Sequence, residues 1–415
     1  MRRTTVRCFA LAAALGLAAF ASAQEKVIKI GTLFPLTGPV ATAGQRCQAA
    51  VETMADIING LHPELNLPLA KKGGLLDGYK IVLVKADHQG KPDVAKSEAE
   101  RLYGQEGVFA VIGCYNSSAT KPASAVAERL EKLFMCGSSS SAALTERDFK
   151  YFFRMAPTDK VEANEFVDLF GEMNKAMGAG IKTAGVIFEN TEFGKHAADE
   201  TKAACKAQGI SVVADVAFTP GATNLNSEVQ TLKGRNPDVV FGAVLGADYP
   251  LMVRTMKQAA WKPKAFISFC SGYQDPKIAE QLGKDGWGFM GSAGYTPEFG
   301  LKYMKAVAAV EKYYKEKVEV PYDSNSIQES VALYVLALAI EKAGAADTAK
   351  VAQVLRTTTF DSPLSMGGKV YFDAGGQNMG SKSVITQLLD GAYVTVYPAE
   401  YKERDKPLFP MPAWR

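Results

Sequence analysis

The sequence predicts an α/β protein built from two doubly wound lobes. Three observations lead to this fold class. Short apolar, strand-like segments alternate with helical segments from residue 27 onward, the alternation occurs in two successive runs, and polar or small residues follow most of the strand-like segments. Short apolar strands between helices are typical of parallel sheets that helices cover on both faces. Two such runs indicate two lobes rather than one long sheet.

The first run extends from residue 27 to residue 137. Its strand-like segments are 27–34, 80–87, 108–113 and 133–137, and its helical segments are 44–59, 91–104 and 118–131. Pro92 falls in the first turn of the second helix, where its missing N–H costs nothing. The segment 61–78 follows neither pattern, and we expect it to be a surface insertion.

The second run extends from residue 183 to residue 270. Its strand-like segments are 183–189, 211–218, 237–244 and 264–270, and its helical segments are 193–209, 224–236 and 249–261. A long helix is expected at 326–345, followed by a terminal β-meander formed by 369–377 and 383–398.

The first residues have the pattern of a secretory signal peptide. Arg2, Arg3 and Arg7 precede an apolar run, and Ala21-Ser22-Ala23 forms a small-residue cleavage site. We therefore expect a signal peptide at 1–23, a mature chain that starts near Gln24, and export. The apolar run is too short to span a membrane as a helix.

Composition narrows the classes of partner. With 47% hydrophobic and 22% charged residues the chain is that of an ordinary globular protein. The net charge of +3 comes without a block of Lys or Arg, so we expect no nucleic-acid or membrane partner. An odd number of cysteines follows the leader, which implies a free thiol or an intermolecular bond and leaves the pairing open. These cysteines are Cys47, Cys114, Cys136, Cys205 and Cys270.

The motifs of the common catalytic and metal sites are missing from the sequence. GxSxG does not occur, and His62, His88 and His196 are scattered without the spacing of metal ligands. The glycine-rich stretch 178–185 precedes a strand, whereas a nucleotide-binding loop follows one. We therefore expect no enzymatic activity, no metal and no cofactor.

Polar and small residues repeat at the carboxyl ends of the expected strands. Ligands of open α/β sheets bind beyond these ends, so two such rims predict a cleft between two lobes. Serines at a helix start can cap the helix or hold an anion with its N–H groups. The segments are 35–44, 114–118 and 137–141 in the first run, and 190–194, 246–250 and 271–275 in the second.

Several segments, in order, resemble a known family. They are IGTLFPLTGPVATAG, VFAVIGCYNSSATKPAS, FMCGSSSSAALTERDFKYFFRMAPTD and FTPGATNLNSEVQTLKGRNPDVVF. From about 27 to 398 the chain resembles the type I periplasmic binding proteins of ABC importers, in the branched-chain amino-acid (leucine/isoleucine/valine-binding) group. The resemblance implies two Rossmann-like lobes joined by three crossovers near 158, 296 and 366. Lobe 1 would comprise 24–158 and 297–365, and lobe 2 would comprise 159–296 and 366–415.

The resemblance also implies a ligand site. In this group, first-lobe hydroxyls and N–H groups hold the carboxylate of an amino acid, which corresponds here to Ser117, Ser138 and Ser140. Asn116 neighbours this rim. An apolar group of the ligand would lie against Phe193, Tyr115 and either Tyr249 or Tyr273, and Cys270 is a further candidate for the lining.

The sequence departs from the group where the ligand's ammonium should be paired. The group's glutamate falls near Cys270, where no acid is present. An unpaired ammonium in a closed cleft is costly. Either Asp248 takes over this role, or the ligand carries no amine.

The expected function is that of a monomeric periplasmic substrate-binding component. It would deliver a small carboxylate, of the hydrophobic or branched-chain amino-acid class, to an inner-membrane ABC permease. Three alternatives stay open: an aromatic acid or short amide as ligand, a sensing module that docks on a membrane receptor, and an exported enzyme with a base near 138–141.

Overall fold

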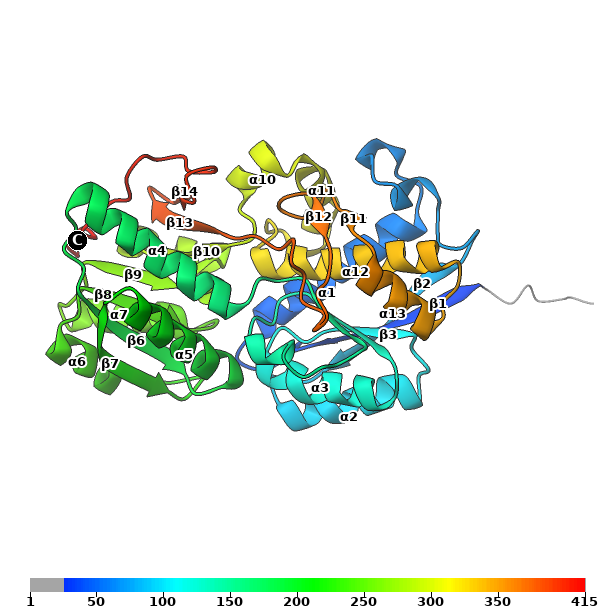
Figure 1. The fold of residues 1–415 in the computed structure, drawn as a ribbon, viewed down its shortest axis with the longest axis horizontal. Helices are drawn as coiled ribbons and strands as arrows, with labels where there is room; N and C mark the ends of the chain where they lie inside the picture. The colour runs from blue at the N-terminus through cyan, green and yellow to red at the C-terminus, as the bar shows by residue number, and fades with distance from the viewer. Residues whose placement is uncertain (1–25, 415) are drawn as a thin grey trace, which may run out of the picture.

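The computed structural model describes residues 26–414, apart from the side chains of Cys270 and Ser271. The expected signal peptide lies outside the described residues. Two lobes lie side by side, one around a five-stranded sheet and the other around a seven-stranded sheet (Figure 1). A two-stranded ribbon completes the strands of the described part of the chain. The predicted α/β class with two doubly wound lobes is confirmed.

The sheet of the first lobe is parallel throughout, in the order β2-β1-β3-β4-β5. Its strands are β1 (Val27–Phe34), β2 (Lys80–Asp87), β3 (Ala110–Gly113), β4 (Leu133–Cys136) and β5 (Phe152–Arg154). The accompanying helices are α1 (Ala41–Asn59), α2 (Pro92–Gly104), α3 (Ser117–Arg129), α10 (Pro297–Tyr303), α11 (Lys305–Val318), α12 (Ser324–Ala343) and α13 (Thr348–Thr357).

Successive side chains of the short strands pack on opposite faces of the sheet, in two separate hydrophobic clusters. In β3, Ala110 and Ile112 pack with the helices α1 and α12, whereas Val111 packs with α2 and α3. Because both faces are covered, these strands are apolar without alternation, which is why the sequence showed them clearly.

The second sheet has the order β14-β13-β10-β9-β8-β6-β7, with β13 antiparallel to both of its neighbours. Its strands are β6 (Thr183–Glu189), β7 (Ser211–Phe218), β8 (Val239–Ala243), β9 (Ala265–Ser268), β10 (Met290–Ala293), β13 (Val384–Leu389) and β14 (Ala392–Tyr397). Its helices are α4 (Asp159–Met177), α5 (Glu192–Ala207), α6 (Asn226–Arg235), α7 (Asp248–Gln258), α8 (Cys270–Tyr273) and α9 (Pro276–Leu282).

The chain passes between the lobes three times. The first passage follows β5 and leads into α4, and the second follows β10 and leads to α12, which packs on α1. The last stretch carries β11 (Phe360–Asp361) and β12 (Lys369–Val370) and still touches the first sheet at the bridge between Arg154 and Gln377. We therefore propose that the third crossover lies between 378 and 384 instead of near 366.

Two further observations concern the insertion at 61–78 and the cysteines. The segment 61–78 contains the 3₁₀ helices η1 (Pro63–Leu65) and η2 (Leu69–Lys71). Leu61 is exposed, but the insertion packs on the core through four buried leucines, Leu65, Leu67, Leu69 and Leu75. Two further 3₁₀ helices are η3 (Ala142–Leu144) and η4 (Gly283–Gly286). The pairing of the cysteines was left open by the sequence, and in the structure Cys114, Cys136 and Cys205 are buried free thiols.

Candidate functional site

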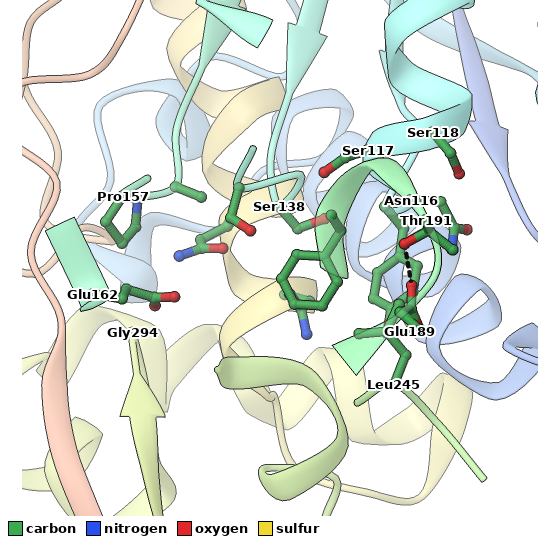
Figure 2. Close-up of a pocket in the computed structure, with 16 residues that line it drawn as sticks. Asn116, Ser117, Ser118, Ser138, Pro157, Glu162, Glu189, Thr191, Leu245 and Gly294 are labelled. Carbon is green, nitrogen blue, oxygen red and sulfur yellow. Dashed lines mark hydrogen bonds between the residues drawn. The ribbon is translucent and has the colours of Figure 1, made fainter. Parts of the chain in front are cut away.

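A cavity lies where the carboxyl ends of the two sheets face each other. Its walls come from the residues after β3 and β4 on one side and after β6 and β8 on the other (Figure 2). It encloses about 590 Å³ that protein atoms leave empty, part of it open to solvent.

The start of α3 supplies hydrogen-bond donors on the first-lobe side. Asn116 is the N-cap residue, and its carbonyl accepts the N–H groups of Ala119 and Thr120. Ser117 and Ser118 stand in the first turn and line the cavity, and their N–H groups have no partner within the helix. A helix start of this kind favours an anion.

Tyr115 is held in an unusual backbone conformation beside this helix start. Its φ of +77° lies in the left-handed region, which residues other than glycine seldom adopt. The Oγ of Ser139 donates to the carbonyl of Tyr115 at 3.0 Å. Tyr115 lines the cavity and also a neighbouring hollow beside Arg46. Strain of this kind is often retained at ligand sites.

Ser138 is tied to a buried carboxyl group. Its hydroxyl donates to Glu329 Oε1 at 2.7 Å, and the N–H of Gly137 donates to Oε2 at 3.1 Å. Gly137 has to be glycine, since a Cβ there would lie 2.4 Å from Glu329 Oε2. Burial raises the pKa of Glu329 to about 7. With Glu329 ionised, the proton of Ser138 is not available to a ligand carboxylate.

The second-lobe wall carries a carboxyl group and two apolar side chains. Glu189, at the end of β6, is 3% exposed, and its Oε1 accepts the hydroxyl of Thr191 at 2.7 Å. Burial raises the pKa of Glu189 to about 7, against the opposing effect of that hydrogen bond. Phe193 and Leu245 line the same cavity, and Phe193 meets Phe269 edge to face.

A second carboxyl group, Glu162 of α4, lies at another part of the cavity. It is 5% exposed, and burial raises its pKa to about 8. Figure 2 shows Glu162 beside Pro157 and Gly294, on the opposite side of Ser138 from Glu189. Among the described residues that line the cavity, none is Lys, Arg or His. The cavity therefore favours groups that donate hydrogen bonds or carry positive charge.

The structure brings six of the predicted site residues together and separates the others. Tyr115, Asn116, Ser117, Ser138, Ser140 and Phe193 all line the cavity. Asp248 does not line it, and its Oδ2 accepts the N–H of Gly221 at 2.8 Å. Tyr249 is 1% exposed and packs on Phe266, because it occupies the core face of α7. The side chain of Cys270 lies outside the described residues.

Sequence reasoning missed the three carboxyl groups at or behind the cavity, Glu162, Glu189 and Glu329. Glu189 ends β6, one residue before the polar segment that was considered, so the rim argument could have found it. Glu329 lies in α12 and meets Ser138 only through the fold. No local pattern distinguishes it from an ordinary helical glutamate.

Contacts across the cleft hold the two lobes together. Arg46 of α1 pairs with Asp275 of the second lobe at 2.7 Å and with Asp323 of the first lobe at 3.3 Å. Lys121 of α3 pairs with Glu192 of α5 at 2.9 Å. The cavity is thus enclosed by a closed arrangement of the lobes.

Two features are missing from residues 26–414. No cluster of three or more His, Cys, Asp or Glu residues has the arrangement of a metal site there. No helix in the described part of the chain is long and apolar enough to cross a membrane.

Two doubly wound lobes with a polar cavity between facing strand ends define a bilobal binding protein. The chain matches the family model described as periplasmic binding protein over residues 27–392, and it belongs to this family. It is 28% identical over 401 residues to the Leu/Ile/Val-binding protein homolog 7 of Brucella suis biovar 1 (strain 1330), which covers 94% of this chain and 95% of the relative. The resemblance seen in the sequence is therefore confirmed.

Solved structures share the fold. The substrate binding protein LivJ from Streptococcus pneumoniae in complex with isoleucine has a TM-score of 0.74 and 19% identity, covering 90% of this chain and 100% of that chain. A solute binding protein from R. palustris in complex with benzoate has a TM-score of 0.74 and 18% identity, covering 94% and 97%.

The family establishes the general class of function. This chain is a periplasmic binding protein, which places it in a family of binding proteins and not of enzymes. The two solved structures with the same fold are substrate-binding or solute-binding proteins of transporters. The family also implies a periplasmic location, as expected from the leader.

Proposed function

We propose that this chain binds an α-amino acid between its lobes and delivers it unchanged to an inner-membrane ABC permease. The observation that carries the proposal is the pairing of a helix start with a buried carboxyl group at one end of the cavity. Figure 2 shows Ser117, Ser118 and Glu189 on the same side of the cavity.

These two groups match the two charges that an α-amino acid carries on one carbon. The N–H groups at the start of α3 and the hydroxyls of Ser117 and Ser118 would hold the carboxylate. Glu189 would pair with the ammonium, a role for which the sequence offered Asp248 as one of two alternatives. The contact of Ser138 with Glu329 makes Ser138 a weaker donor than we had expected.

Isothermal titration of the mature protein with single amino acids tests this proposal. Leucine, isoleucine and valine come first, because the resemblance names their class. Glu189→Gln is expected to lower the affinity for every amino acid by about tenfold to a hundredfold, since it removes a charge-assisted hydrogen bond. Lack of binding by every amino acid would contradict the proposal.

An amine-free aromatic acid remains the alternative ligand, together with a short amide. The aromatic acid is disfavoured, since its negative charge would enter a cavity whose described lining has two carboxyl groups and no basic side chain. Benzoate belongs in the same titration. Binding of benzoate that Glu189→Gln leaves unchanged, without binding of amino acids, would favour this alternative.

Delivery to a permease, as opposed to docking on a sensory receptor, is supported by two proteins of the same fold, which are binding proteins of transporters. Uptake of the labelled ligand by cells with and without the gene tests it. Equal uptake by both strains would favour the sensing role.

A further inference from the structure

The end of the cavity opposite Glu189 has a polar lining that the α-carbon groups of a ligand do not use. Glu162 lies there beside Gly294 (Figure 2). The amide of Gln328 belongs to the same region, since its Nε2 lies 3.0 Å from the position that a Cβ on Gly294 would take. A carboxyl group and a carboxamide therefore face whatever occupies this end.

The surroundings of Glu162 supply no positive charge. Burial is the largest influence on its pKa, the neighbouring acids Glu165 and Asp159 raise it further, and only the hydroxyl of Ser292 lowers it. Asp159 is itself paired with His196 at 3.0 Å. Among the described residues, the carboxyl group of Glu162 is consequently short of hydrogen-bond donors.

A ligand with a hydrocarbon side chain would leave the carboxyl group of Glu162 without a hydrogen-bond donor. Pressed against Glu162, it would exclude water without offering a hydrogen bond, and burying a polar group in this way is costly. A ligand tail that ends in an N–H donor would satisfy the same group. The apolar side chains Phe193 and Leu245 can still cover the methylene groups between the two ends.

We propose that Glu162 selects the tail of the ligand, so that the site takes an amino acid whose side chain ends in an amide or amine. This inference rests on the proposed function, because it assumes that the α-carbon groups bind at Glu189. It replaces the branched-chain class by a polar-tailed one of similar length.

Titration of the mature protein with leucine, glutamine and lysine tests the inference. The wild type is expected to bind glutamine or lysine about tenfold or more tightly than leucine. Glu162→Leu is expected to lower the affinity for glutamine or lysine, whose tails donate hydrogen bonds, by about tenfold or more. The affinity for leucine should stay the same or increase. Binding of leucine also serves as the measure that the variant folds.

Glu165→Gln is the matched control. Glu165 lies on the same helix, and burial raises its pKa to about 7, but its carboxyl group accepts from Ser383 and does not line the cavity. This variant is expected to keep the order of affinities.

Each other outcome has a distinct meaning. If the wild type binds leucine more tightly than both donor-tailed ligands, or if Glu162→Leu weakens all three equally, the selection by Glu162 is wrong while the proposed function stands. If none of the three binds and no other amino acid does, the proposed function itself is contradicted.

Discussion

At the scale of single residues, the buried carboxyl groups control the chemistry of the cavity. Glu162, Glu189 and Glu329 are each 5% exposed or less, and burial raises the pKa of each of them. A carboxyl group in such surroundings holds its proton near neutral pH unless a cation or a donor faces it. Ligand binding and protonation should therefore be linked.

Affinity for an amino acid should fall as the pH is lowered through about 7, the raised pKa of Glu189 in the free protein. The ligand's ammonium favours the ionised form and so lowers this pKa in the complex. Between the pKa of Glu189 in the complex and its pKa in the free protein, protons compete with the ligand, and the dissociation constant rises as the pH falls. Titration across this range checks the prediction, and Glu189→Gln should flatten the profile. A profile that stays steep in this variant would assign the dependence to another group.

Glu329 should make the ligand-free protein less stable as the pH rises. The pKa is about 7 in the folded protein and has its ordinary value of 4.5 when unfolded. Between these values the folded state holds the extra proton, so stability is fully present below 4.5 and declines through about 7. The full shift corresponds to roughly 3 kcal/mol.

Urea unfolding at about pH 5 and about pH 8 measures this decline. Glu329→Gln keeps an acceptor for Ser138 but cannot titrate, so it should lose less stability over the same range. The remaining decline would come from Glu162, Glu165 and Glu189, which have the same sign. An equal decline in the variant would show that Glu329 is not titrating there.

At the scale of elements, the contacts between helices of different lobes differ in strength. Arg46 and Asp275 are largely buried, with side-chain exposures of 4% and 14%. Lys121 and Glu192 are more open, at 50% and 25%. Exposed ion pairs contribute little, whereas breaking a buried pair leaves an uncompensated charge.

Asp275→Asn should therefore speed ligand release by about tenfold, because it loosens the closed form. Asn still caps α9, where Asp275 accepts the N–H of Lys277 at 2.9 Å, so the helix itself should remain. Lys121→Ala is the matched control and should change release little. Stopped-flow measurement of dissociation decides between them, and equal rates for the two variants would contradict the role of Arg46.

The elements also show which parts of the structure the sequence could predict. Apolar strands such as β1 and β6 were located at their observed bounds, because parallel strands covered on both faces read as unbroken apolar runs. The three-residue strand β5 and the helix α4, which lie on either side of the first passage between the lobes, were not assigned. Missing α4 also meant missing Glu162.

The site residues divide in the same way. Ser117 and Phe193 were found through the resemblance, and the structure places both in the first turn of a helix that follows a strand. Tyr249 was misplaced because the sequence does not show which face of α7 turns to the core. The contact between Glu329 and Ser138 joins positions 191 residues apart and could not be predicted locally.

At the scale of the whole molecule, the two lobes and their facing strand ends explain binding without chemistry. The cavity exists only between the lobes, so closure encloses the ligand and at the same time creates one continuous outer surface that a permease can recognise. The open form should be more extended in solution, and ligand should reduce the radius of gyration measured by small-angle scattering. An unchanged radius at saturating ligand would contradict closure on binding.

A crystal structure of the complex with the tightest-binding amino acid tests the central claim most directly. The account predicts density for an unaltered ligand between the lobes, with its carboxylate on the N–H groups of Ser117 and Ser118 and its ammonium on Glu189. Density outside the cleft, or a ligand whose carboxylate points away from the start of α3, would contradict it.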